Sequence, residues 1–125
     1  EVELKLSPGV QAFADQRLFL RAIENLLRNA VKYADGKVRL EFTKEGGQIC
    51  VAVHDDGPGI PQDMRDKVLL PFYRLEADRG REMGGFGLGL AIVRRITERH
   101  RGQLLIDTSP LGGASVVTKW SSAIE

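Results

Sequence analysis

The segment from Leu18 to Val31 repeats its apolar residues at intervals of three and four, which is the period of an α-helix. Each residue turns about 100° around a helix, so Asn25, Asn29 and Lys32 share one narrow stripe. Such a stripe is usually the solvated face of an amphipathic helix, but asparagine favours caps and turns over helix interiors. Two asparagines one turn apart therefore leave two interpretations open, a solvated face and a face on which a polar ligand docks. The apolar residues expected on the other, buried side are Phe19, Leu20, Ile23, Leu26, Leu27, Ala30 and Val31.

Strand-like alternation of apolar and polar residues recurs on both sides of this helix and predicts a sheet of about five strands. The turn Glu45-Gly46-Gly47 joins two of them closely, which favours antiparallel pairing. The expected class is α+β: a two-layer sandwich whose mixed, mainly antiparallel sheet is covered on one face by about three helices. The expected strands are residues 1–6, 37–44, 48–55, 103–108 and 114–120. Three helices are expected: the first from an N-cap at Asp15 to about residue 34, the second from Pro61 to about residue 70, and the third from 88 to 100.

The composition limits the function classes open to this chain. Its 18 basic and 17 acidic residues give a net charge of +1, so no strong field points to nucleic acid or to an anionic membrane. The single cysteine, Cys50, excludes an internal disulfide, and with His54 and His100 it has no metal-site spacing. We expect residues 1–125 to form a single domain that is a fragment of a longer protein, because the first residues already follow a strand pattern.

A cluster of glycines directly precedes the last predicted helix: Gly85, Gly87 and Gly89. The first N–H groups of a helix favour anions, and glycine lets a phosphate approach the backbone closely. The spacing fits neither the dinucleotide-binding fingerprint, Gly-x-Gly-x-x-Gly after a strand, nor the P-loop with its Gly-Lys-Ser/Thr. The cluster therefore predicts a phosphate site of a third kind, with a flexible loop as the alternative.

Asp55 ends a predicted buried strand, just before Gly57 and Gly59. A carboxylate fixed at the bottom of a pocket can accept a hydrogen bond from an exocyclic amino group, such as that of adenine. An acidic residue followed by glycine is more often only a turn. Taken together with the asparagine stripe and the second glycine cluster, however, Asp55 favours a nucleotide site.

Four motifs follow one another along the chain. They are Asn25-x-x-x-Asn29-Ala30-x-Lys32-Tyr33, Asp55-x-Gly57-x-Gly59-Ile60, Pro71-Phe72-Tyr73-Arg74 and Gly85-x-Gly87-Leu88-Gly89-Leu90. In order and spacing they resemble the ATP-binding catalytic domain of two-component sensor histidine kinases, which belongs to the gyrase, Hsp90, histidine kinase and MutL ATPase superfamily. The resemblance covers nearly the whole chain. It implies the Bergerat-type ATP-binding fold, with ATP and Mg²⁺ as cofactors.

The resemblance also implies roles for individual residues. Asn29 would ligate Mg²⁺, a hard ion that prefers oxygen ligands, and Asn25 would lie close to the phosphates. Lys32 would pair with phosphate oxygens, and Asp55 would accept a hydrogen bond from the adenine amino group. Residues 75–86 would form a lid over the nucleotide. The other residues expected around the cofactor are Tyr33, Gly57, Gly59, Ile60, Phe72, Gly85, Gly87, Leu88 and Gly89.

The reaction implied by the resemblance is transfer of the γ-phosphate of ATP to a histidine on a separate dimerisation segment of a parent sensor kinase. Relay of the phosphoryl group to a response regulator would follow. The expected catalytic residues are Asn25, Lys32 and Arg74, the last of which would reach the γ-phosphate, where positive charge stabilises the transferring group. Arg79 and Arg81 are rivals for that role.

Neither histidine of the chain lies in the acidic and proline context of an acceptor motif, so the acceptor is expected outside residues 1–125. We expect the domain to lie in the cytoplasmic part of an inner-membrane sensor protein, without touching the membrane itself. Its expected partners are the dimerisation segment and the response regulator, and nucleic acid is not among them.

Three alternatives remain beside the kinase: an ATP-hydrolysing clamp or chaperone, a serine kinase, and a non-enzymatic nucleotide sensor. The hydrolytic members of the superfamily resemble one another in a glutamate general base at the position of Asn25. Asparagine cannot take a proton from water, and the neighbouring Glu24 is turned about 100° away from the stripe. The kinase is therefore the favoured reading, and intact motifs argue against a degenerate sensor.

Overall fold

The computed structural model describes residues 2–6, 16–70 and 89–121 of the 125-residue chain. These ranges hold five strands, two α-helices and two short 3₁₀ helices. The strands are β1 (Val2–Leu6), β2 (Val38–Glu45), β3 (Gln48–Asp55), β4 (Gln103–Thr108) and β5 (Ala114–Ser121); the α-helices are α1 (Gln16–Tyr33) and α2 (Gly89–Arg99); the 3₁₀ helices are η1 (Gln62–Met64) and η2 (Lys67–Leu69).

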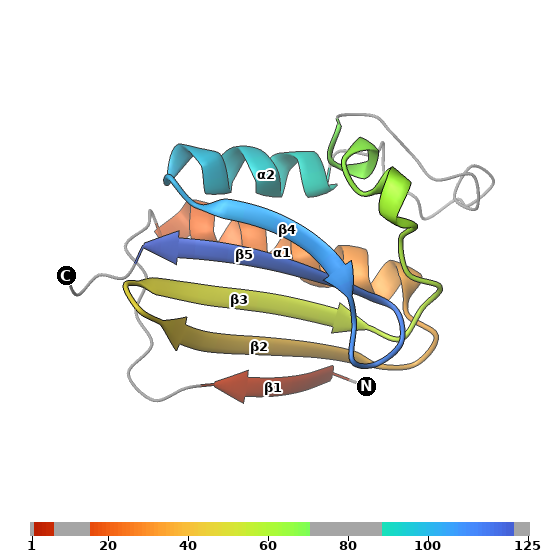
Figure 1. Ribbon diagram of the computed structural model, residues 1–125. Helices are drawn as coiled ribbons and strands as arrows, with labels where there is room; N and C mark the ends of the chain where they lie inside the picture. Colours follow the sequence, from red (N-terminus) through yellow and green to blue (C-terminus); the bar gives the residue numbers. More distant parts are fainter. Residues whose placement is uncertain (1, 7–15, 71–88, 122–125) are drawn as a thin grey trace.

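The strands form one mixed sheet in the order β1-β2-β3-β5-β4. β1 runs parallel to β2, and the other three pairs are antiparallel. Both α-helices lie on the same face of the sheet (Figure 1). The predicted α+β class, the mainly antiparallel pairing and the five strands are therefore confirmed. The helix expected between Pro61 and residue 70 is instead the pair of 3₁₀ turns, and the expected N-cap Asp15 lies outside the described residues.

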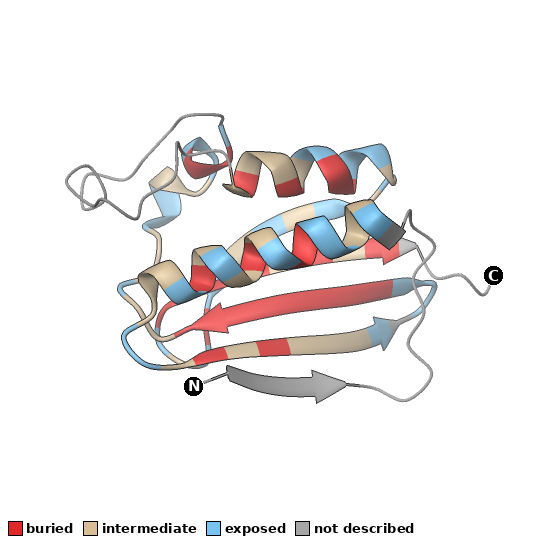
Figure 2. Ribbon diagram, turned by 180° about the vertical axis from the view of Figure 1, so that it is seen from behind, coloured by how far each residue is buried: buried red, intermediate tan, exposed pale blue. Residues whose placement is uncertain are grey.

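The core lies between the sheet and the two helices. From the central strand β3, Ile49, Val51 and Val53 point into this layer, where they join Leu26 of α1 and Val93 of α2 in one cluster of buried side chains. All of these residues are at most 1% exposed. β3 is buried along nearly its whole length (Figure 2), because it has neighbours on both sides as well as helices on one face. The strand that ends in Asp55 is thus the most constrained strand of the described sheet.

One end of the core is closed by Trp120 of β5, which is fully buried. Its ring meets Phe19 of α1 edge-on at a centroid distance of 4.9 Å and lies 5.6 Å from the ring of His100. The indole Nε1–H donates a hydrogen bond of 2.8 Å to Thr118 Oγ1. Burying this large side chain without leaving its N–H unsatisfied anchors the N-terminal half of α1 on the sheet.

Two of the side chains expected on the buried side of α1 are exposed, Leu20 by 52% and Val31 by 57%. The buried arc of α1 is centred on Leu26, and positions 20 and 31 lie about 120° and 140° away from it around the helix. Asn25 and Asn29 are half-buried because they lie at one edge of that arc. The apolar period thus predicted the helix correctly but made its buried face too wide.

Candidate nucleotide site

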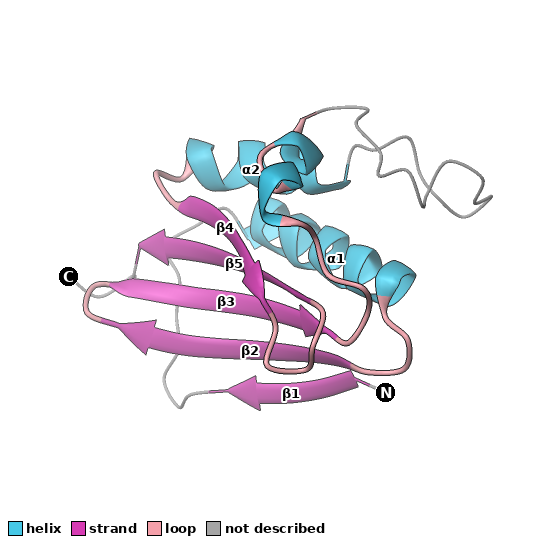
Figure 3. Cartoon of the chain, turned by 45° about the vertical axis from the view of Figure 1, so that its right-hand side comes forward, coloured by secondary structure: helices cyan, strands magenta, loops and turns pink. Residues whose placement is uncertain are grey.

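Three segments meet at one end of the sheet, the last turn of α1, the end of β3 and the loop between β4 and β5 (Figure 3), and the first residue of α2 lies beside the middle of α1. The end of β3 and the end of α1 carry two of the predicted motifs, and the first residue of α2 completes part of a third. Residues far apart in sequence are therefore brought to one place. We call this end of the molecule the Asp55 site, after the residue at which its backbone contacts converge.

Asp55 is 3% exposed and is held by backbone N–H groups from two directions. Its Oδ1 accepts hydrogen bonds from Gly57 N–H at 2.9 Å and from Ala114 N–H at 3.1 Å, while its carbonyl oxygen accepts one from Gly113 N–H at 3.1 Å. Within the described part of the chain, Oδ2 accepts no hydrogen bond. The carboxylate is thus fixed through one oxygen, and the other is left for a donor that does not belong to these residues.

Two glycines allow the backbone to approach Asp55 this closely. A Cβ on Gly113 would lie 2.1 Å from Asp55 Oδ1, and a Cβ on Gly57 would lie 2.1 Å from the carbonyl oxygen of Tyr33. Gly59 has a φ of +79°, in the left-handed region that favours glycine, and packs against the backbone of Gly113. The loop after β3 and the loop before β5 therefore pack backbone against backbone, with no room for a side chain between them.

The asparagine stripe of α1 borders the first turn of α2. Asn25 Nδ2 donates a hydrogen bond of 2.9 Å to Arg21 O one turn earlier, and Asn25 Oδ1 lies 3.9 Å from the position of a Cβ on Gly89. Asn29 is half-buried, and its side chain makes no hydrogen bond to the described residues. Lys32 Nζ lies 5.2 Å from the ring centroid of Tyr33. The structure thus places the Asn25 amide beside the start of α2 and the Lys32 ammonium near the Tyr33 ring.

Several predicted residues cannot be placed. Residues 71–88 lie outside the described ranges, and they include the expected lid and most of the second glycine cluster. Of that cluster, Gly89 is described, as the first residue of α2. The predicted site residues that lie outside the described ranges are Phe72, Arg74, Gly85, Gly87 and Leu88.

Asp56 has a role that its place in the sequence did not reveal. Its Oδ1 accepts hydrogen bonds from Asp35 N–H at 2.8 Å and from Gly36 N–H at 3.0 Å, in the turn that follows α1. The backbone N–H of Gly36, followed by those of Lys37 and Asp35, lowers the pKa of the Asp56 carboxyl below its ordinary 3.8. Asp56 thus ties the end of α1 to the end of β3, immediately beside Asp55.

The loop before β5 was also missed, because Gly112 and Gly113 read from sequence as an ordinary turn between strands. Ser109 N–H donates to Gly113 O at 2.8 Å, and the loop returns the chain so that Gly113 and Ala114 reach Asp55. Nothing local in the sequence links residue 114 to residue 55. The one sequence feature that could have indicated this contact is Gly113, the second of two adjacent glycines just before the strand.

The two histidines have structural contacts. His54 is 7% exposed, and its Nε2 lies 3.3 Å from Glu41 Oε1 on the neighbouring strand. His100 Nδ1 lies 2.8 Å from Ile96 O at the end of α2. The described residues contain no group of three or more His, Cys, Asp or Glu side chains that could hold a metal ion. None of the helices in the described ranges is both long and apolar enough to cross a bilayer.

Comparison with known proteins identifies the fold. The family model described as histidine kinase-, DNA gyrase B- and HSP90-like ATPase matches residues 14–123. This chain belongs to that family. The sensor histidine kinase CpxA of Escherichia coli (strain K12) is 44% identical to it over 96 residues, which make up 77% of this chain and 21% of CpxA. The chain therefore spans about a fifth of the length of that curated relative.

Solved structures of the histidine kinase-like ATPases agree with this assignment. The mycobacterial sensor histidine kinase MprB superimposes with a TM-score of 0.83 at 30% identity, covering 98% of this chain and 81% of that one. Full-length ShkA in complex with AMPPNP gives a TM-score of 0.79 at 29% identity, covering 98% of this chain and 26% of that one. The domain is the ATP-binding catalytic domain of a histidine kinase, which confirms the family predicted from the four motifs.

We predict that Gly113→Ala destabilises the domain by about 1–3 kcal/mol, the usual cost of inserting a methyl group into a packed site. Its Cβ would press on Asp55 Oδ1 and on the N–H of Gly57, at 2.1 and 2.6 Å. Urea unfolding followed by circular dichroism measures the change. Gly47→Ala is the matched control, because its Cβ would meet nothing within 4 Å. Equal stability of the two variants would show that the two loops are not packed as described.

Proposed function

We propose that this domain binds Mg-ATP and transfers the γ-phosphate to a histidine on the dimerisation segment of a longer sensor kinase. A response regulator then receives the phosphoryl group. The observation that carries the proposal is the state of Asp55: a buried carboxylate with one oxygen held by two backbone N–H groups and the other without a donor among the described residues. Such a group is built to receive one external donor.

The base end of the nucleotide follows from this geometry. Because Oδ1 is already occupied, Oδ2 accepts the exocyclic amino group of adenine, and a carboxylate acceptor makes that hydrogen bond stronger than a neutral one. Gly57, Gly59 and Ile60 form the loop beside it, and none of them places a bulky polar group next to Asp55. A base with a carbonyl oxygen in place of the amino group would set two acceptors against each other, so Asp55 selects adenine.

The phosphate end lies along α1. Asn29 offers an amide oxygen, and Mg²⁺ is typically held by one or two protein oxygens together with phosphate oxygens and waters. A cluster of acidic ligands is therefore not required, which agrees with the ligands available in the described residues. When bound, Mg²⁺ neutralises charge on the β- and γ-phosphates. Lys32 adds a positive charge on the same stripe, and the first N–H groups of α2, beginning at Gly89, favour an anion.

The residue at position 25 separates a kinase from a hydrolase. The amide of Asn25 donates to Arg21 O and faces the start of α2, so it orients groups but cannot remove a proton from water. Glu24 is exposed on another side of α1, about 100° around the helix. No carboxylate of the described α1 thus occupies the place of a general base. CpxA and MprB, named above, are sensor histidine kinases, which agrees with this reading.

The acceptor histidine lies on another segment. His54 is buried in the sheet with its Nε2 on Glu41, and His100 is engaged with Ile96 O, so neither presents an imidazole to an incoming phosphoryl group. We therefore propose that residues 1–125 form a single ATP-binding domain, part of a longer protein that supplies the acceptor. We further propose that it works in the cytoplasmic part of an inner-membrane sensor, with Arg74 at the γ-phosphate and residues 75–86 as a lid over the nucleotide.

We expect Asp55→Asn to weaken Mg-dependent binding of a fluorescent ATP analogue at least about tenfold, because hydrogen bonds to charged groups contribute about 1.5–3 kcal/mol. Fluorescence titration with and without Mg²⁺ measures this. Asp66→Asn is the control, since the Asp66 side chain is exposed and caps nothing. Thermal unfolding without nucleotide shows whether the variants are folded. Undiminished binding by folded Asp55→Asn would contradict the assignment of the adenine end.

Phosphotransfer is tested by mixing the domain with the dimerisation segment of its parent and γ-labelled ATP. The proposal predicts label on that segment that is stable in base and labile in acid, as expected for phosphohistidine. At ATP concentrations well below its Kd, Asp55→Asn should lower this label at least about tenfold, in line with its weaker binding. Steady release of phosphate without label would instead support a clamp-type ATPase, and acid-stable label would support a serine kinase.

A further inference from the structure

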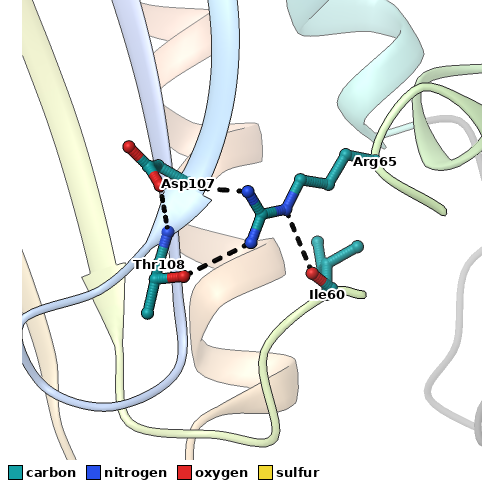
Figure 4. Close-up of polar contacts among 4 residues, drawn as sticks. All are labelled: Ile60, Arg65, Asp107 and Thr108. Carbon is teal, nitrogen blue, oxygen red and sulfur yellow. Dashed lines mark hydrogen bonds and ion pairs between the residues drawn. The ribbon is translucent and has the colours of Figure 1, made fainter. Parts of the chain in front are cut away.

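Arg65, between η1 and η2, bridges the loop 57–60 that follows β3 and the end of β4 (Figure 4). Its Nε–H donates a hydrogen bond of 3.1 Å to Ile60 O, and an Nη2–H donates one of 3.3 Å to Thr108 Oγ1. Its Nη1 lies 3.8 Å from Asp107 Oδ1. The side chain is 24% exposed, so most of its surface is buried. Sequence analysis gave Arg65 no role, and the four motifs do not include it.

The two ends of this bridge meet again at Asp55. Ile60 closes the loop that begins at Gly57, whose N–H is bonded to Asp55 Oδ1. Thr108 is the last residue of β4 and is the register partner of Ala114, whose N–H is bonded to the same oxygen. A closed ring of contacts therefore runs through Asp55, the loop 57–60, Arg65, the end of β4 and the start of β5.

The loop 57–60 needs such a contact at its far end. Its near end is fixed by the hydrogen bond of Gly57 to Asp55, but Gly59, with a φ of +79°, has a backbone that can rearrange easily. The carbonyl of Ile60 is directed at Arg65, and the side chain of Ile60 packs on the core. Losing Arg65 removes the hydrogen bond that holds the backbone at the far end of the loop.

We propose that Arg65 is a positioning residue for the base end of the nucleotide site. It acts through Ile60 O on one side and Thr108 on the other, and so holds the loop 57–60 at a fixed distance from the Asp55 carboxylate. This inference rests on the proposed function. A guanidinium suits the task because its rigid fork of N–H groups can serve acceptors on two elements at once, whereas a lysine ammonium is a single point charge on a flexible stem.

The hydrogen bonds of Arg65 to Ile60 O and Thr108 Oγ1 contribute more to positioning the loop than its ion pair with Asp107 does. Asp107 is 77% exposed and 3.8 Å away, a geometry in which surface ion pairs contribute little. The hydrogen bonds to Ile60 O and Thr108 Oγ1 are shorter and directed. Asp107→Asn should therefore leave nucleotide affinity nearly unchanged, which separates positioning by the hydrogen bonds from a general effect of charge.

The test measures ATP and GTP affinities of the folded domain by competition with a fluorescent ATP analogue. Arg65→Ala should lower ATP affinity roughly threefold to tenfold, the range for losing the one hydrogen bond between Asp55 and the adenine amino group. It should lower GTP affinity much less, so that the preference for ATP over GTP shrinks. Arg65→Lys should recover little. Arg94→Ala is the matched control. In the described residues the one ion pair of Arg94 is with Glu98, at 3.4 Å on the surface. This variant should have the wild-type affinities for both nucleotides.

The outcomes separate the two proposals. If the wild type binds ATP and Arg65→Ala retains the wild-type preference for ATP over GTP, the positioning role is wrong, whether affinity is unchanged or both affinities fall equally. If the ATP and GTP affinities fall equally and the melting temperature also falls, Arg65 stabilises the fold without positioning the nucleotide. If the wild type itself does not bind ATP, the proposed function is wrong, and the inference about Arg65 is rejected with it.

Discussion

The Asp55 carboxylate, held by the N–H groups of Gly57 and Ala114, is the contact on which the functional end of the molecule depends. It joins the central strand, the loop after it and the start of β5 at one oxygen. A buried carboxylate is costly unless it is hydrogen-bonded, so these N–H groups both stabilise the charge and fix its direction. The glycines beside it follow from the same contact, because Gly113 has no space for a side chain.

The hydrophobic core and the polar contacts near Asp55 have different roles in building the site. The core of the sheet and the two helices makes β3 rigid, and the site lies where that rigid strand ends. Asp56 attaches the end of α1 to it, and Arg65 attaches the loop 57–60 to β4. The proposed phosphate contacts, Asn29 and Lys32, lie on the edge of the buried arc of α1. A helix packed in this way presents its polar stripe at a fixed distance from Asp55.

The sequence predicted much of this, since periodicity and turn residues define elements locally. The bounds of β3 and β4 and the family were right. What failed depends on tertiary contact. Leu20 is exposed because the helix period does not say how wide the buried arc is. Gly113 went unrecognised because Asp55 lies far away in sequence, and Arg65 because the bridge it makes also needs Thr108, 43 residues further on.

The central claim, that Asp55 selects adenine through its amino group, is tested most directly by changing the ligand and the residue together. Inosine triphosphate carries a carbonyl oxygen where ATP carries that amino group. We predict that the wild type binds ATP at least about tenfold more tightly than inosine triphosphate, as expected for a hydrogen bond to a charged group, and that Asp55→Asn nearly abolishes the difference. Equal affinities in the wild type, or an unchanged preference in the folded variant, would contradict the account.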